Sequence, residues 1–206
     1  IADRPWTVKR KQLLWASRIS LTEQLVAWLA SREQKPDVLL SGSAVGWYGD
    51  AGERELDERQ PPVSSDYASQ LCAAWEDAAL LAEPLGIRVV RIRTGLVLAA
   101  DGGFLKRLLL PFKLALGGPI GNGRQWMPWI HLHDQVALMD FLLHHEAACG
   151  PYNACAPAPV RSRAFAKALG AALHRPAFMP LPAIFLKLGL GELSVLLLGG
   201  QRALPK

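Results

Sequence analysis

The sequence contains little cysteine: three residues, Cys72, Cys149 and Cys155, in a chain of 206. They form no C-x-x-C pair, and an odd number of thiols cannot pair completely within one chain. The pattern therefore gives no support to a disulfide framework or to a cysteine-based zinc site. We expect reduced thiols in a cytoplasmic protein, and we interpret Cys149 and Cys155 as small buried side chains rather than nucleophiles.

Long uninterrupted apolar runs are also missing. The most apolar stretch, 177–200, is broken by Pro180, Pro182, Lys187 and Glu192, so it offers no span of about 20 apolar residues for a membrane helix. We expect one or two helices there, packed on the core or on a partner, and pairing of protomers stays open as an alternative. The chain opens with Ile and has no charged and apolar leader, which predicts a protein that is not secreted and whose sequence continues upstream.

The third missing feature is a broad cluster of charges of one sign. The formal net charge is +5, yet the basic residues are scattered, with Lys9, Arg10 and Lys11 as the dense run. A surface that binds nucleic acid concentrates its positive charge, so we do not expect nucleic acid as a partner. We interpret the run as the solvated face of a helix.

What the chain does contain is an alternation of helical and strand patterns. The predicted helices cover residues 6–31, 64–83, 104–116, 134–146 and 163–173. The predicted strands cover residues 37–41, 87–93, 129–132 and 152–154. The run at 37–41 has no polar alternation, which indicates a strand that is covered on both faces, and the intervening helices favour right-handed crossovers. We therefore predict an α/β fold that contains part of a Rossmann-type, doubly wound parallel sheet.

Local signals add detail to three of these helices. The apolar stripe of the first helix consists of Leu14, Leu21, Leu25 and Leu29. The predicted N-caps are Ser64, Ser65 or Asp66 for the second helix and Asp134 for the fourth. These residue types accept hydrogen bonds from the free N–H groups at a helix start.

Two patterns look like ligand sites but lack the necessary context. The glycine-rich run 117–123 follows a predicted helix and precedes none, so a tight turn is favoured over a phosphate-binding loop. His131 and His133 would share one face of a strand just before Asp134, but no third ligand has a convincing spacing. We therefore expect no metal site.

The segment from Val38 to Trp75 is the most informative for chemistry. Ser43 follows the strand predicted at 37–41, and parallel sheets bind ligands at the carboxyl ends of their strands. Tyr67 lies at the start of the next helix, so the two hydroxyl groups could form a proton-transfer pair beside a carbonyl or alcohol. The structural alternatives are a Ser43 hydroxyl bonded to the backbone and a Tyr67 ring packed on its own helix.

The stretch LLSGSAVGWYGD resembles the extended short-chain dehydrogenase/reductases. The later segments VVRIRTGLVLA, GGPIGNGRQWMPWIH, GPYNACAPAPV and GGQRALPK do so too, and together they cover nearly the whole chain. They are similar in particular to the atypical "epimerase family" branch, whose members are often described as nucleoside-diphosphate-sugar epimerases. Within the middle segment, Arg124 and Gln125 are compatible either with contact to a substrate or with plain surface exposure.

The resemblance implies a Rossmann-type domain over 1–113 and a mixed substrate region with returning helices over 114–206. It also implies a nicotinamide cofactor, NADP or NAD, and a small-molecule substrate of the carbonyl, alcohol or sugar type. The residues that it would place beside the cofactor are Ser41, Gly42, Arg93, Thr94, Gly95 and Val97. The glycine loop that binds the pyrophosphate in the family has no counterpart here, so we expect this chain by itself to bind dinucleotide weakly.

Two departures from the family pattern bear on activity. The catalytic tyrosine and lysine of the family fall on Ala68 and Cys72, or on Tyr67 and Leu71 in the neighbouring register. Neither register contains the lysine, and a phenol without a cationic neighbour is a poor base at neutral pH. Residues 127–129, Met-Pro-Trp, stand where sugar-nucleotide enzymes carry Arg-Asp-aromatic. A non-catalytic NADP(H)-binding sensor or interaction protein is therefore the alternative to an enzyme.

Overall fold

The computed structural model describes residues 4–63 and 66–206. Its α-helices are α1 (Val8–Trp15), α2 (Leu21–Ala30), α3 (Tyr67–Leu80), α4 (Gly103–Lys113), α5 (Leu132–His144), α6 (Ser162–Ala172), α7 (Ala183–Leu190) and α8 (Val195–Leu198). Its strands are β1 (Val38–Ala44), β2 (Glu55–Leu56), β3 (Arg88–Thr94), β4 (Leu96–Ala99), β5 (Trp126–Met127), β6 (Trp129–His131), β7 (Gly150–Ala154), β8 (Val160–Arg161) and β9 (Arg202–Ala203).

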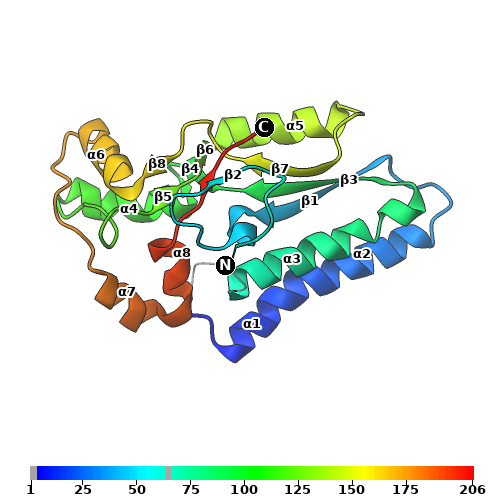
Figure 1. Ribbon diagram of the computed structural model, residues 1–206, viewed down its shortest axis with the longest axis horizontal. Helices are drawn as coiled ribbons and strands as arrows, with labels where there is room; N and C mark the ends of the chain where they lie inside the picture. Colours follow the sequence, from blue (N-terminus) through cyan, green and yellow to red (C-terminus); the bar gives the residue numbers. More distant parts are fainter. Residues whose placement is uncertain (1–3, 64–65) are drawn as a thin grey trace.

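The main sheet has three parallel strands in the order β1-β3-β7. Figure 1 shows α2 and α3 side by side on one face of this sheet and α5 on the other. Successive residues of β3 serve the two faces: Val89 packs in the core under α2 and α3, whereas Val90 packs in the core under α5. The predicted α/β architecture with a parallel sheet covered on both faces is confirmed.

The first helical segment differs from the predicted stripe. Its buried apolar side chains are Leu14, Ile19, Val26 and Leu29. The prediction was wrong for Leu21 and Leu25, which are 60% and 42% exposed. A π-helical turn at Ala16–Ser20 joins α1 to α2, and such a turn holds an additional residue and rotates the buried face of the helix. A plain 3.6-residue period therefore gives the wrong inner positions after the turn.

The helix starts agree with the predicted caps in one case and differ in the other. Asp66 caps α3, where its carboxylate accepts a hydrogen bond from the Ser69 N–H at 3.0 Å. The other two candidates, Ser64 and Ser65, lie outside the described residues. The prediction of Asp134 for α5 was wrong, because β6 leads directly into this helix and the His131 imidazole takes the cap position.

The remaining elements form a smaller region beside the main sheet, on the left of Figure 1. There β4 pairs with β6 in parallel, β5 pairs with β8 antiparallel, and α4 and α6 lie next to these pairs. The chain then forms α7 and α8 and returns through β9, which pairs in parallel with β2. In the part of the chain that the structure describes, no helix is long and apolar enough to cross a membrane.

The glycine-rich run forms a turn, as predicted, and β5 rather than a helix follows it. Gly121 and Gly123 both have positive φ angles, +57° and +72°, which L side chains rarely adopt. The turn places Gly123 against the start of α6, where its carbonyl accepts a hydrogen bond from the Arg163 N–H at 3.0 Å.

Candidate functional site

The carboxyl ends of β1, β3 and β7 lie at one edge of the main sheet, because the three strands are parallel and in register. Ser43 pairs with Arg93 across β1 and β3, and Arg93 pairs with Asn153 across β3 and β7. The fold therefore brings the predicted residues Ser43 and Arg93 together with a third polar side chain. This row of three is where a parallel sheet usually meets its ligand.

Ser43 is buried at 5% exposure and points toward α3. Its hydroxyl donates a hydrogen bond to the Glu76 carboxylate, with 2.7 Å between Oγ and Oε1. The donor of the Ser43 hydroxyl is thus already used within the protein. A substrate oxygen could receive this hydrogen bond only if the hydroxyl turned away from Glu76.

Arg93 forms a buried ion pair with the same carboxylate. Its Nε lies 2.8 Å from Glu76 Oε1 and its Nη2 lies 3.0 Å from Oε2, and both side chains are 3% exposed. The guanidinium also lies 3.5 Å from the centre of the Trp47 ring. Burial alone lowers the pKa of Arg93, but the hydrogen bonds and charge of Glu76 outweigh it, so the pKa is raised. Arg93 is a fixed cation that holds α3 against the sheet edge.

Tyr48 extends this network toward the C-terminal residues. Its hydroxyl accepts from Arg93 Nη1 at 3.1 Å and lies 2.9 Å from Asn153 Oδ1 and 3.0 Å from the Asp57 carbonyl. The Asn153 amide donates to the carbonyls of Leu56 and Leu204 at 3.2 and 2.9 Å. The network therefore connects the sheet edge with β2 and the segment that follows β9. Burial raises the pKa of Tyr48.

Tyr67, the second predicted catalytic residue, has partners of its own. Its hydroxyl donates to the Lys11 carbonyl at 2.9 Å, and its ring packs edge-on against Trp6 with 5.0 Å between ring centres. The Lys11 ammonium lies 4.6 Å from the centre of the ring. Burial raises the pKa of Tyr67, so the phenol keeps its proton at neutral pH. The hydroxyl groups of Ser43 and Tyr67 thus bond to different groups.

The positions that correspond to the family's tyrosine and lysine are both buried. Ala68 is 8% exposed and Cys72 is 4% exposed, on the inner side of α3. Burial raises the pKa of the Cys72 thiol to about 12, so this group stays neutral and supplies no positive charge. Nothing at position 72 can do what a lysine does there.

The other residues predicted to contact a cofactor have mixed surroundings. Ser41 is buried, and its hydroxyl lies 3.4 Å from the Gly42 carbonyl. A Cβ at Gly42 would lie 2.8 Å from the Trp75 ring, and one at Gly95 would lie 2.2 Å from the Pro128 carbonyl oxygen. Close packing within the protein therefore accounts for both glycines.

Thr94 and Val97 complete the predicted set. Val97 packs in the core under α5. Thr94 is half-buried at the end of β3, and its hydroxyl has one long hydrogen bond, 3.5 Å to the Ile92 carbonyl. Of the predicted cofactor contacts, Thr94 offers the polar group that is least committed to protein partners.

Glu76 is not among the site residues predicted from the sequence, although it organises the sheet edge. Arg91 also contacts it, with 3.3 Å between Nη1 and Oε2. A signal in the sequence could have identified it. Arginines at 91 and 93 share one face of a strand predicted to belong to a parallel sheet, and buried charges need an opposite charge nearby. This reasoning would have pointed to a glutamate on the adjoining helix.

No group of three or more metal-ligating side chains occurs among the described residues. His131 and His133 contact each other edge-on, with 4.9 Å between ring centres, and His131 Nδ1 accepts from the His133 N–H at 3.2 Å. The His131 imidazole thus caps the start of α5, and the His133 imidazole packs against it.

Comparisons with known proteins give a consistent result. The model of the NAD dependent epimerase/dehydratase family matches residues 1–155, and a domain of unknown function (DUF1731) matches residues 181–206. The epimerase family protein YfhF of Bacillus subtilis is 38% identical over 98% of this chain, and an epimerase family protein of Mycobacterium leprae is 42% identical over all of it. The chain spans 66% of the length of each of these two relatives.

Solved structures extend the likeness to three dimensions. A crystal structure of the human epimerase family protein SDR39U1 with NADPH matches 99% of this chain with a TM-score of 0.94 and 35% identity, and the match covers 69% of the human chain. A nucleoside-diphosphate sugar epimerase from Corynebacterium glutamicum matches 97% of this chain and 39% of its own, with a TM-score of 0.72 and 31% identity.

Proposed function

This chain belongs to the NAD-dependent epimerase/dehydratase family, and we propose that it acts as an NADP(H)-dependent oxidoreductase or epimerase-like enzyme. Its substrate would be a small carbonyl, alcohol or sugar-type molecule. One observation carries this proposal: nearly the whole chain superimposes on a human relative that was crystallised with NADPH. The expected compartment is the cytoplasm, in keeping with three cysteines that are all free.

At the carboxyl edge of the sheet, two of the predicted residues could contact the cofactor. Thr94 has a hydroxyl that is free to change partner, and we assign it to a contact with the nicotinamide end of the cofactor. Gly95 would add backbone contacts beside it. When bound, the cofactor would give or take a hydride. Ser43 would orient the reacting oxygen of the substrate by moving its hydrogen bond from Glu76 to that oxygen.

The residues at the family's proton-transfer positions differ from the usual tyrosine and lysine. Tyr67 is protonated at neutral pH, so it could give a proton but is a poor base. Position 72 has a neutral thiol in place of a lysine. These two observations favour the second candidate, a protein that binds NADP(H) without turnover and works as a sensor or interaction partner.

The test measures binding and turnover separately in the complete gene product. NADPH is titrated by calorimetry, and its oxidation is then followed at 340 nm with a panel of aldehydes, ketones and keto-sugars. Saturable binding with turnover on any of them supports the enzyme. Binding without turnover across the panel selects the sensor, and the absence of binding removes both candidates.

A matched pair of variants locates the site if turnover is found. Ser43→Ala should lower kcat by about a hundredfold, because a hydrogen bond to the reacting oxygen is worth that much in comparable sites. Ser31→Ala removes a surface hydroxyl that bonds to the Trp28 carbonyl and should leave kcat unchanged. Equal rates in the two variants would show that Ser43 takes no part in the reaction.

A further inference from the structure

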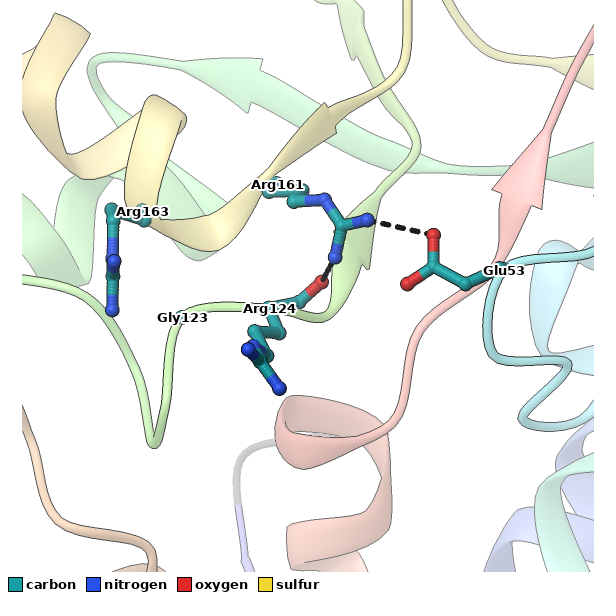
Figure 2. A pocket seen from close by; sticks show the side chains of 5 residues that line it. All are labelled: Glu53, Gly123, Arg124, Arg161 and Arg163. Carbon is teal, nitrogen blue, oxygen red and sulfur yellow. Dashed lines mark hydrogen bonds and ion pairs between the residues drawn. The ribbon is translucent and has the colours of Figure 1, made fainter.

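A cavity of about 460 Å³ opens between the smaller region and the loop that follows β1. The residues that line it are Glu53, Gly123, Arg124, Arg161 and Arg163. Figure 2 shows Arg161 at the end of β8, Arg163 at the start of α6, and Arg124 on the turn before β5. Residues far apart in the sequence therefore bring three guanidinium groups to one opening.

Arg161 is held in place from several sides. Its Nη2 lies 2.7 Å from Glu53 Oε2, and its Nη1 donates to the Arg124 carbonyl at 2.8 Å (Figure 2). Its guanidinium also lies 4.6 Å from the centre of the Trp126 ring. Trp126 Nε1 donates to the same Glu53 oxygen at 3.1 Å. One arginine of the cavity is thus a fixed part of its wall, and Glu53 serves to position it.

The other two arginines are less occupied. Arg163 Nη2 makes one long hydrogen bond, 3.3 Å to the Asn122 carbonyl. The guanidinium of Arg124 has no hydrogen bond or ion pair to any residue that the structure describes, although its backbone N–H donates to Asn122 Oδ1. Figure 2 shows these two side chains on either side of the turn at Gly123. Most of their N–H donors are therefore available to a ligand.

The charge of the cavity is unbalanced. Three guanidinium groups face one carboxylate, which leaves two positive charges on the lining residues. A phosphate monoester carries close to two negative charges at neutral pH, and the planar donors of arginine suit its oxygens. We propose that this cavity binds the phosphate group of a small phosphorylated ligand, with Arg124 and Arg163 as the direct contacts.

An adjoining cavity indicates what the rest of the ligand is like. Its volume is about 440 Å³, and it shares Arg163 with the first cavity. Its other lining residues are Pro119, Gly121, Asn122, Ala177, Phe178 and Pro180. Phe178 is 73% exposed at this opening. A ring or another apolar group attached to the phosphate would cover that side chain, which favours aromatic or ring-containing phosphates over inorganic phosphate.

The inference deepens the proposed function, because it makes the substrate a phosphorylated small molecule. The binding itself needs neither cofactor nor turnover. It can therefore be measured alone, and loss of NADPH binding with retained phosphate binding would refute the proposed function and leave the phosphate site standing.

The experiment titrates phenyl phosphate and inorganic phosphate into the complete gene product by calorimetry at low ionic strength. Saturable binding is expected, tighter for phenyl phosphate. Arg124→Gln and Arg163→Gln should each weaken the binding of phenyl phosphate by about tenfold, since each removes a charged hydrogen-bond donor. Glu53→Gln should strengthen binding severalfold, because it removes the negative charge that competes with the ligand.

Matched controls separate a site from a general charge effect. Arg32→Gln and Glu33→Gln change the net charge by the same amounts at two exposed positions of another loop, and neither should move the affinity by more than about twofold. The proposal is overturned if the wild type shows no saturable binding, or if the cavity variants behave like these controls. Parallel loss of NADPH affinity in Arg124→Gln would assign the cavity to the cofactor and would also overturn it.

Discussion

The sheet edge and the arginine-lined cavity both gather charged side chains, but they balance the charge differently. At the edge, the Glu76 carboxylate is 3% exposed and contacts Arg93, Arg91 and the Ser43 hydroxyl. In the cavity, the Glu53 side chain is 68% exposed and pairs with Arg161 alone among three arginines. In the first cluster the charges are paired within the protein, whereas in the second cluster N–H donors of the arginines remain available to a ligand.

Burial explains this difference. A charge removed from water must find its partners inside the protein, because an unpaired one would cost several kcal/mol. A charge at an open surface is stabilised by water and salt, so an excess of one sign can persist there. The buried cluster therefore stabilises the fold, whereas the open cluster is able to bind an anion.

The largest expected effect comes from breaking the buried cluster. Glu76→Gln should lower the free energy of unfolding by about 3–5 kcal/mol, because it leaves Arg93 buried without its counter-charge. Asp77→Asn, one residue along α3 and exposed, should change it by less than about 0.5 kcal/mol. Urea denaturation measures both, and equal stabilities would mean that the buried pair does not hold the sheet edge together.

A smaller loss is expected at the tyrosine that extends the buried cluster. Tyr48→Phe removes the hydroxyl that joins Arg93, Asn153 and the Asp57 carbonyl, and should cost about 1–3 kcal/mol, since buried groups lose their partner. Tyr152→Phe is the matched control, because Tyr152 is half-buried and makes no hydrogen bond through its hydroxyl to a described residue. If both variants unfold at the same urea concentration, the Tyr48 hydroxyl does not contribute to the stability of the fold as predicted.

The smallest expected effect on stability comes from Glu53 in the open cluster, and it depends on pH. Hydrogen bonds from Arg161 and Trp126 lower the pKa of Glu53, so the folded state favours its ionised form. The stability it adds is present above the pKa of an ordinary carboxyl group and is lost as the pH falls through the lowered pKa.

The thermal midpoints of the wild type and Glu53→Gln test this sign. They should differ slightly at pH 7, with the variant lower, and should converge in acid. Glu33→Gln should match the wild type at both pH values. A difference that grows in acid would reverse the assigned direction.

Much of the fold could be predicted because its signals are local. The apolar run of β1, the Asp66 cap of α3 and the glycine-rich turn all depend on neighbours within a few residues. The stripe through Leu21 and Leu25 failed because a π-helical turn changed the helical period, and nothing in the residues around Ala16–Ser20 marks such a turn.

The site was predicted less completely. The position of Ser43 at the end of a strand follows from the chain pattern, but its bond to Glu76 joins residues 33 positions apart. The ion pair between Arg161 and Glu53 joins residues 108 positions apart, and no local pattern connects them. The roles proposed for Ser43, Tyr67, Thr94 and the division at residue 113 stay predictions.

The order of apolar and polar residues along the chain was enough to predict a parallel α/β sheet, and the resemblance of its motifs was enough to identify the family. Only the tertiary structure decided that Arg93 is neutralised by a buried glutamate while Arg124 keeps its donors free. The physical reason is that the environment of a charge depends on which distant segments enclose it, and a linear pattern carries no record of that.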